Sequence, residues 1–168
     1  MNWSFAAKST DRDDHPRTYI FPHTVDRECF NSTQRWPVVT NTPVTKLPDN
    51  TSARVATARK GQTVQVLDTE IHTTRPGKIL VLKDHGAFKK GDVVWLYTDD
   101  GEETGVYWYH GDFVGEDLMI DFRNDDKLSW GQITQDLESE LWIKLRLEDG
   151  SEGWTLHLEN FSNFDSCS

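Results

Sequence analysis

Carboxylates are the most numerous reactive side chains in this sequence, and they gather in one stretch. Residues 98–126 hold ten of the 28 acidic residues and a single arginine. Two well-placed carboxylates are sufficient for glycoside hydrolysis. These acids cluster at expected turns, however, where Asp and Glu are ordinary residues, so their number alone does not indicate catalysis. A hydrolase would need one acid pair in a deep cleft, and it is kept as an alternative.

The other reactive side chains show no spacing typical of an active site. The six histidines lie at positions 15, 23, 72, 85, 110 and 157, without an H-x-H or H-E-x-x-H motif. Cys29 and Cys167 belong to no C-x-x-C pair, and no G-x-S-x-G nucleophile elbow occurs. Residues 121–127 are rich in oxygen ligands but lack the central Gly and closing Glu of an EF-hand loop. The sequence therefore predicts a non-enzymatic protein with no catalytic residues, no metal and no cofactor.

Aromatic residues are interleaved with acids between residues 97 and 117, and this combination predicts a binding surface. On an extended strand Tyr107 and Tyr109 share one face and Trp108 takes the other, so one of these faces points outward. Exposed rings beside carboxylates suit the Arg and Lys side chains of a partner. The alternative is a core-facing pair beside a solvated acidic face. The predicted partner-binding residues are Tyr97, Asp99, Asp100, Glu102, Glu103, Tyr107, Trp108, Tyr109, Asp112, Glu116 and Asp117.

The charge distribution limits the classes of partner. The formal net charge is −10, and residues 98–126 alone contribute −9. Such a cluster repels nucleic-acid phosphates and anionic lipid surfaces, so we expect no nucleic-acid ligand. A basic protein surface is the simplest partner. No run of about 18 apolar residues occurs, so no membrane span is expected.

The cysteines and the N-terminal residues bear on the compartment. A disulfide between Cys29 and Cys167 would tie the N-terminal arm to the C-terminal tail and would imply an oxidising compartment. Two free thiols are the alternative. The first residues lack the apolar region of a signal peptide. We expect a periplasmic or secreted protein whose signal peptide has been removed.

β-Strands are the elements expected to position these residues, because period-two alternation dominates from residue 38 onward. Within residues 53–72, Val64, Val66 and Leu67 are expected to face inward and Lys60-Gly61 to form the turn. Residues 129–141 form the exception, with one or two helical turns started by Ser129.

Two hairpins are expected around Asp-Gly turns, which are strong hairpin signals. The first covers residues 89–115 with its turn at 100–101, and the second covers residues 141–161 with its turn at Asp149-Gly150. Trp142 and Trp154 in the second hairpin are predicted to be core residues.

An internal repeat predicts two small barrels. The segments ARKGQTVQVL (58–67) and FKKGDVVWLY (88–97) align and place Gly61 thirty residues before Gly91. Two later strands, at 105–109 and 152–156, also correspond. This order favours one barrel nested in the other over a tandem of 38–115 and 116–161. The expected parts are an extended arm at 1–37, an outer barrel split between 38–75 and 127–161, an inner barrel at 76–126, and a tail at 162–168.

Parts of the sequence resemble the bacterial SH3-like (SH3b) domain family. TPVTKLPDNTSARVATARKGQTVQVLD is similar to the first half of such a domain, and LWIKLRLEDGSEGWTL is similar to the second half. ILVLKDHGAFKKGDVVWLY is similar to the opening of another SH3 fold. The resemblance covers about residues 40–161. It implies an all-β protein of two SH3-like barrels with an irregular N-terminal arm.

Two functions follow from these observations. The first is an extracytoplasmic binding protein, such as an inhibitor or immunity protein, that engages a basic partner through the acidic, aromatic hairpin. The second, implied by the SH3b resemblance, is a cell-wall module that targets peptidoglycan. Peptidoglycan carries carboxylates that repel an acidic module, so the first is preferred.

Overall fold

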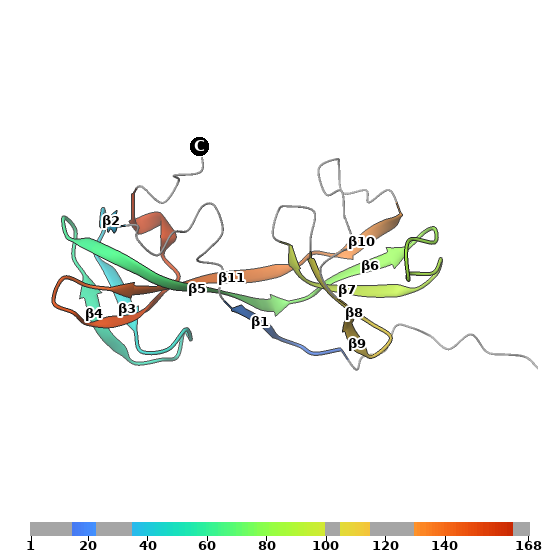
Figure 1. Ribbon diagram of the computed structural model, residues 1–168, viewed down its shortest axis with the longest axis horizontal. Coiled ribbons are helices and arrows are strands. Elements are labelled where there is room, and N and C mark those ends of the chain that lie inside the picture. The colour runs from blue at the N-terminus through green and yellow to red at the C-terminus, as the bar shows by residue number, and fades with distance from the viewer. Residues whose placement is uncertain (1–14, 23–34, 100–104, 115–129, 163–168) are drawn as a thin grey trace, which may run out of the picture. The chain divides into compact units, whose positions relative to one another are not determined.

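The computed structural model describes residues 15–22, 35–99, 105–114 and 130–162. These residues form β-strands with one short 3₁₀ helix, so the predicted all-β class is confirmed (Figure 1). The chain divides into two compact units. Unit 1 comprises residues 1–19 and 73–139, and unit 2 comprises residues 20–72 and 140–168. In the sequence, most of unit 1 therefore lies between two segments of unit 2.

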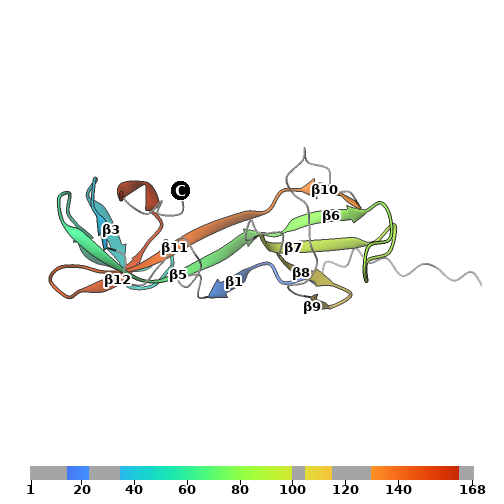
Figure 2. The same cartoon turned by 45° about the horizontal axis from the view of Figure 1, so that its top comes forward.

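Unit 1 contains a five-stranded antiparallel sheet with the order β10-β6-β7-β8-β9 (Figure 2). Its strands are β6 (Gly77–Val81), β7 (Val93–Asp99), β8 (Gly105–Tyr109), β9 (Asp112–Val114) and β10 (Gly131–Gln135). The register sets Trp95 opposite Trp108 and Trp108 opposite Phe113. Three large aromatic residues therefore lie in one row across β7, β8 and β9.

The core of unit 1 lies on one face of this sheet, and half of its eight buried residues are aromatic. Phe88 is at its centre, with ring centroids 5.0 Å from Tyr109, 5.3 Å from Trp130 and 5.9 Å from Tyr107. Large rings fill a small interior efficiently, because each buries roughly 150–250 Å². The buried set is Ile79, Val81, Phe88, Val94, Leu96, Tyr107, Tyr109 and Trp130.

The helical turns expected in residues 129–141 do not occur in residues 130–141, which the structure describes, and that prediction was wrong. Residues 131–135 form β10, which pairs with β6 in the sheet of unit 1, and β11 begins at Glu138. Ile133 packs against the core while Gln132 and Thr134 are exposed, which is strand periodicity. A sheet edge supplies a full ladder of hydrogen bonds, whereas an isolated helical turn supplies almost none.

The second sheet has seven strands, in the order β1-β5-β11-β12-β3-β4, with β2 also paired to β5. The elements are β1 (Tyr19–Pro22), β2 (Arg35–Pro37), β3 (Thr42–Thr45), β4 (Arg54–Ala58), β5 (Thr63–Arg75), β11 (Glu138–Arg146), β12 (Glu152–Thr155) and the 3₁₀ helix η1 (Leu158–Asn160). The division between the units falls inside β1, β5 and β11. Among the described residues, no helix is long and apolar enough to cross a membrane.

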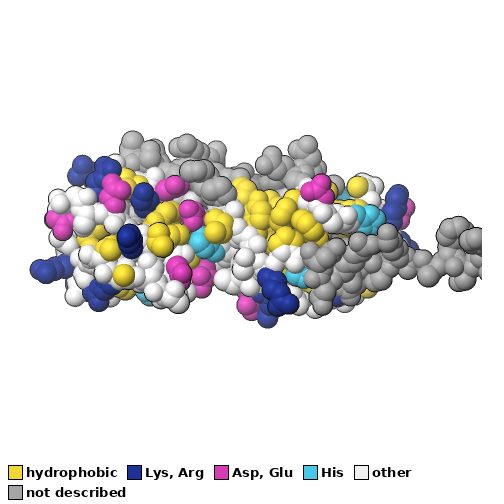
Figure 3. Space-filling view, turned by 90° about the horizontal axis from the view of Figure 1, so that it is seen from below, with side chains coloured by type: hydrophobic (Ala, Val, Ile, Leu, Met, Phe, Trp, Pro, Cys, Tyr) yellow, Lys and Arg dark blue, Asp and Glu magenta, His cyan; other side chains and the backbone are white. Residues whose placement is uncertain are grey.

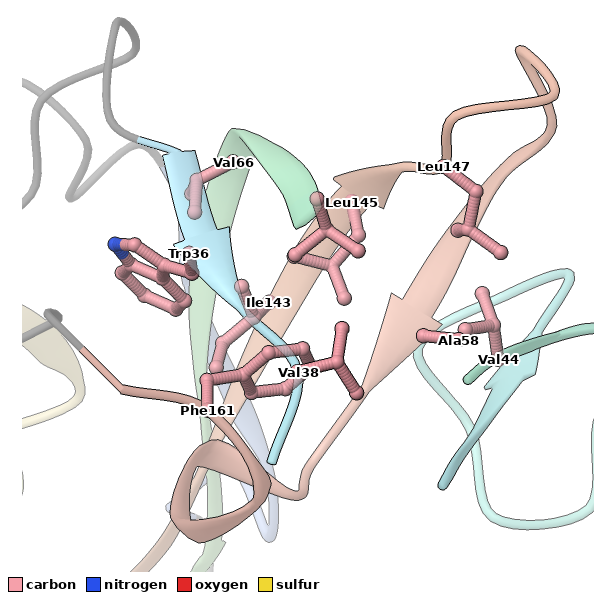
Figure 4. Close-up of a cluster of buried hydrophobic side chains, with 10 residues drawn as sticks. Trp36, Val38, Val44, Ala58, Val66, Ile143, Leu145, Leu147 and Phe161 are labelled. Atoms are coloured by element: carbon pink, nitrogen blue, oxygen red, sulfur yellow. The ribbon is translucent and has the colours of Figure 1, made fainter. Parts of the chain in front are cut away.

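The core of unit 2 is built from side chains of several of these strands (Figure 4). The predicted inward positions of Val64 and Val66 are confirmed, with exposed fractions of 1% and 0%. Trp142 and Trp154 are also buried, as predicted. The members of the buried cluster are Trp36, Val38, Val44, Ala58, Val64, Val66, Ile143, Leu145, Leu147 and Phe161.

Neither sheet is closed into a barrel. Each has two outer strands, β1 and β4 in one and β10 and β9 in the other, and no pairing joins these outer strands in the described part of the chain. The two SH3-like barrels expected from the resemblance are therefore not formed by the strand pairing. What the structure establishes is the coarser class, an all-β protein with two open sheets.

The internal repeat is reproduced in backbone hydrogen bonds. In unit 2, the amide of Gly61 donates to the carbonyl of Val38 at 2.9 Å, and the amide of Val38 donates to the carbonyl of Gln62 at 2.9 Å. In unit 1, the amide of Gly91 donates to the carbonyl of Val81 at 2.8 Å, and the amide of Val81 donates to the carbonyl of Asp92 at 2.9 Å. The two turns are thus held to their neighbouring strands in the same way.

Side chains repeat the same pattern in both turns. The carboxamide of Asn41 accepts from the Lys60 amide at 2.8 Å, and the carboxylate of Asp84 accepts from the Lys90 amide at 2.9 Å. Hydrogen bonds to Lys90 and Lys89 keep the pKa of Asp84 below its usual range. The two units therefore share a structural motif as well as a sequence pattern.

Candidate partner-binding surface

The described residues of the predicted binding stretch lie in unit 1, in the β7–β8–β9 part of the sheet. Alternation along β7 directs Val94 and Leu96 into the core and directs Trp95 and Tyr97 to the opposite face. On that face the rings of Tyr97 and Trp108 both contact Phe113, with centroids 5.3 and 4.9 Å apart. We call Trp95, Tyr97, Trp108 and Phe113 the outer aromatic face.

The close pairing of β7 and β8 depends on a glycine. A Cβ atom at Gly105 would lie 2.7 Å from the carbonyl oxygen of Thr98 and 2.9 Å from the hydroxyl oxygen of Tyr107. Only glycine therefore allows β8 to begin this close to β7. The same pairing sets Asp99 opposite Gly105, so β7 and β8 are paired up to the two ends of residues 100–104, which lie outside the described residues.

An N-terminal segment of unit 1 lies over the outer aromatic face. The imidazole of His15 stacks on the indole of Trp95, with ring centroids 3.8 Å apart and planes at 26°. The ring of Tyr19 lies 4.9 Å from that of Phe113 and 5.8 Å from that of Tyr97. The hydroxyl of Tyr97 donates a hydrogen bond to the carbonyl oxygen of Pro16. These contacts explain how Tyr97 is fully buried although it lies on the face opposite the core.

The structure separates the predicted binding residues into buried and accessible ones. Tyr107 and Tyr109 belong to the core of unit 1, and Tyr97 is covered by the N-terminal segment. Trp108 is partly buried and Asp112 is exposed. Asp99 lies in β7, with its side chain outside the described residues. Asp100, Glu102, Glu103, Glu116 and Asp117 lie in segments outside the described residues, as do Cys29 and Cys167 and the disulfide expected between them.

Sequence reasoning missed four residues that help form this surface. Trp95 and Phe113 belong to the outer aromatic face, and His15 and Tyr19 cover it. Trp95 lies two residues before Tyr97 in an alternating strand, so the spacing could have placed both on one face. Nothing local in the sequence indicates that residues 15–19 pack against a strand about eighty positions away.

Tyr109 has a structural role at the tight turn between β8 and β9. Its hydroxyl donates a hydrogen bond to the carboxylate of Asp92, and its ring stacks on that of His110 with centroids 3.9 Å apart. His110 and Gly111 have φ values of 55° and 92°, which suit a two-residue hairpin turn. Burial, and secondarily the bond to Asp92, raise the pKa of Tyr109 to about 12. The hydroxyl thus remains protonated and serves as a donor.

The accessible surface has both hydrophobic and charged side chains. Figure 3 shows hydrophobic side chains gathered in patches among charged ones on the face that it displays. Phe113 is 36% exposed and is the residue through which the outer aromatic face reaches solvent most openly. Lys78 Nζ lies 5.2 Å from the centroid of the Trp95 ring, a cation–π distance. Among the described residues, no three His, Cys, Asp or Glu side chains form a group that could hold a metal ion.

Comparisons with known proteins do not assign this fold or this surface to a family. No protein-family model matches the chain, and searches of curated proteins and of solved structures gave no significant match.

Proposed function

We propose that this protein is a non-enzymatic, extracytoplasmic binding protein that engages a basic protein partner through the β7–β8–β9 region of unit 1. An inhibitor or immunity protein is the specific form that we favour. The observation that carries the proposal is the arrangement of rings and acids. The outer aromatic face lies on the same strands whose connection contains Asp100, Glu102 and Glu103, and Asp112 is exposed beside Phe113.

The chemistry of such a surface suits cationic side chains. Aromatic faces attract Arg and Lys, and nearby carboxylates raise the association rate of a positively charged protein. The three buried tyrosines change the detail of the proposal. Tyr97, Tyr107 and Tyr109 support the surface from within, while Trp108, Phe113, Asp112 and the acids of residues 99–103 supply the contacts. The SH3-like character of both units is part of the proposal and is supported by the repeated turn motif.

Salt-dependent binding and charge reversal test this function. The tagged protein is used to capture partners from a native extract, with elution by a salt gradient, and the dissociation constant is then measured with the purified partner. The triple variant Glu102→Lys, Glu103→Lys and Asp112→Lys should weaken binding at least about tenfold, because like charges now face the basic partner. The salt dependence of the association rate should fall as well.

A matched control carries the same change in net charge elsewhere. Asp136, Glu148 and Glu159 are exposed acids outside residues 98–126, and their replacement by Lys should leave the affinity close to that of the wild type. Equal affinities of the wild type and the first triple variant would rule out this surface. Binding to isolated sacculi, without a protein partner, would favour the peptidoglycan-targeting alternative.

A further inference from the structure

We propose that residues 15–19 act as an intramolecular ligand of the outer aromatic face, and that the partner protein displaces them with a peptide segment of the same chemistry. This inference rests on the proposed function and names the part of the partner that is recognised. The recognised segment of the partner begins with a planar ring, and the next residue supplies a carbonyl acceptor. A basic side chain follows, and a second aromatic ring lies three residues after the acceptor. The sequence HPRTY has this order.

The first contact is the His15–Pro16 pair on Trp95 and Tyr97. Stacking of the imidazole on the indole at 3.8 Å is the arrangement in which a planar, polarisable ring is recognised by tryptophan. The Nδ1 atom of His15 lies 3.0 Å from the Tyr97 hydroxyl oxygen, which itself donates to the Pro16 carbonyl. This single hydroxyl therefore contacts both the His15 ring and the backbone of the segment.

The second contact is the ring of Tyr19. It packs against Phe113 and meets the edge of Tyr97, so the two anchor rings of the segment use different parts of the outer aromatic face. Arg17 and Thr18, between the anchors, are exposed. The segment thus binds as a short peptide would, through two side chains and one carbonyl group, and not as a continuous strand of the unit 1 sheet.

Charge complementarity connects this segment with the proposed basic partner. Arg17 is exposed on a segment that covers rings of β7 and β9. The most acidic stretch of the chain, residues 98–126 with a net charge of −9, includes the end of β7 and all of β8 and β9. A partner segment with one or more Arg or Lys residues between its rings would bring positive charge to this acidic stretch in the same way. Residues 15–19 therefore have the positive charge that the acidic stretch predicts for a ligand.

Tethering gives this arrangement a regulatory consequence. A segment linked to its own binding face has an effective concentration on the order of millimolar. A free peptide with an intrinsic dissociation constant of about 0.1 mM would then bind the wild type about tenfold more weakly than it binds a protein whose face is open. Release of the segment therefore increases the affinity of the face for any external ligand.

The test uses the full chain and a synthetic peptide of residues 15–19, capped at both ends and labelled with a fluorophore. The double variant His15→Ala/Tyr19→Ala removes both anchor rings of the segment and leaves the four residues of the outer aromatic face unchanged. Thr18→Ala changes an exposed side chain and serves as the matched control. Fluorescence anisotropy should show that the double variant binds the peptide about tenfold more tightly than the wild type. Thr18→Ala should bind like the wild type. Equal affinities of the double variant and the wild type would overturn the inference.

A second change shows that the peptide occupies the outer aromatic face. Adding Trp95→Ala to the double variant should abolish peptide binding, because the stacking partner is lost. If that variant does not fold, Phe113→Ser replaces it, since Phe113 is the most exposed member of the face. Peptide binding that survives the change in a folded protein would contradict the assignment of the face.

Two further measurements separate this inference from the proposed function. The captured partner should bind the double variant more tightly than the wild type if residues 15–19 compete with it, whatever the effect of charge reversal at Glu102, Glu103 and Asp112. If charge reversal leaves the affinity unchanged while the double variant still binds the partner more tightly, only the proposed acidic contact would be overturned. The contrary outcome is that the wild type dimerises as its concentration rises, while the double variant stays monomeric. That result would show that the displacing segment comes from a second copy of this chain, and it would overturn the proposal of a different partner protein.

Discussion

Gly61 and Gly91 occupy the same position in two separate turns, one in each unit. Their φ angles are 89° and 92°, and the amide of each donates to the carbonyl of a buried valine. A Cβ atom at either position would meet no other atom within 4 Å. The turns therefore require glycine for its backbone conformation and not for space.

We expect Gly61→Ala and Gly91→Ala each to lower the free energy of unfolding by about 1–2 kcal/mol, because L-residues rarely adopt this conformation. Gly→Asn at the same positions should lower it less, because Asn tolerates positive φ better. Urea denaturation followed by tryptophan fluorescence measures both changes. An unchanged midpoint for both alanine variants would show that the turns adapt.

Gly153 is expected to respond more strongly, for a different reason. A Cβ atom there would overlap the carbonyl oxygen of Thr45 and lie 2.6 Å from Cγ1 of Val44, so β12 could not remain against β3. Gly153→Ala should cost about 2–3 kcal/mol through overpacking. Gly150→Ala is the control, because Gly150 has a φ of 84° with open space around it and incurs only the backbone cost. A smaller loss at 153 than at 150 would contradict the close approach.

Substitutions at equivalent core positions of the two units should lower the free energy of unfolding by similar amounts. Val64 and Val94 lie thirty residues apart in the repeat, with exposed fractions of 1% and 0%. Replacement of either by Ala should cost about 2 kcal/mol, since two buried methyl groups are lost and a cavity remains. Val55→Ala, at a position 47% exposed, should cost less than about 0.5 kcal/mol. Denaturation curves of the three variants make the comparison, and equal losses in all three would invalidate the assigned cores.

Tyr109 should make stability sensitive to alkaline pH. Its pKa in the folded state is raised to about 12, mainly by burial, whereas an unfolded tyrosine has a pKa of about 10. The stabilisation is therefore fully present below pH ~10 and is lost as the pH rises toward 12. Tyr109→Phe should lose less stability than the wild type between pH 9 and pH 11.5.

The same substitution should also lower stability at pH 7, because the carboxylate of Asp92 loses a buried donor. Chemical denaturation of both proteins at pH 7, 9 and 11.5 measures the two effects. Parallel curves for wild type and Tyr109→Phe across this range would show that the hydroxyl of Tyr109 does not carry the pH dependence. Tyr19→Phe is the control, because it removes a tyrosine hydroxyl and keeps the ring that contacts Tyr97 and Phe113.

The local features of this protein were determined by its sequence. Alternation placed Val64, Val66, Trp142 and Trp154 in the interior, and Asp149-Gly150 and Lys60-Gly61 formed turns as predicted. The repeat at Gly61 and Gly91 was also detected from the similarity of residues 58–67 and 88–97. These features depend on interactions between residues close in the chain, so periodicity and turn chemistry are sufficient to predict them.

Tertiary structure decided what local patterns could not. Residues 131–135 became a strand because they pair with β6 at the edge of its sheet. In the described part of the chain no pairing joins the outer strands of either sheet, so both sheets are open. Tyr97 was predicted as a contact residue but is covered by His15, Pro16 and Tyr19. Which face of a strand becomes core, and which is covered by a distant segment, depends on contacts between residues far apart in sequence. Short-range periodicity contains no information about those contacts.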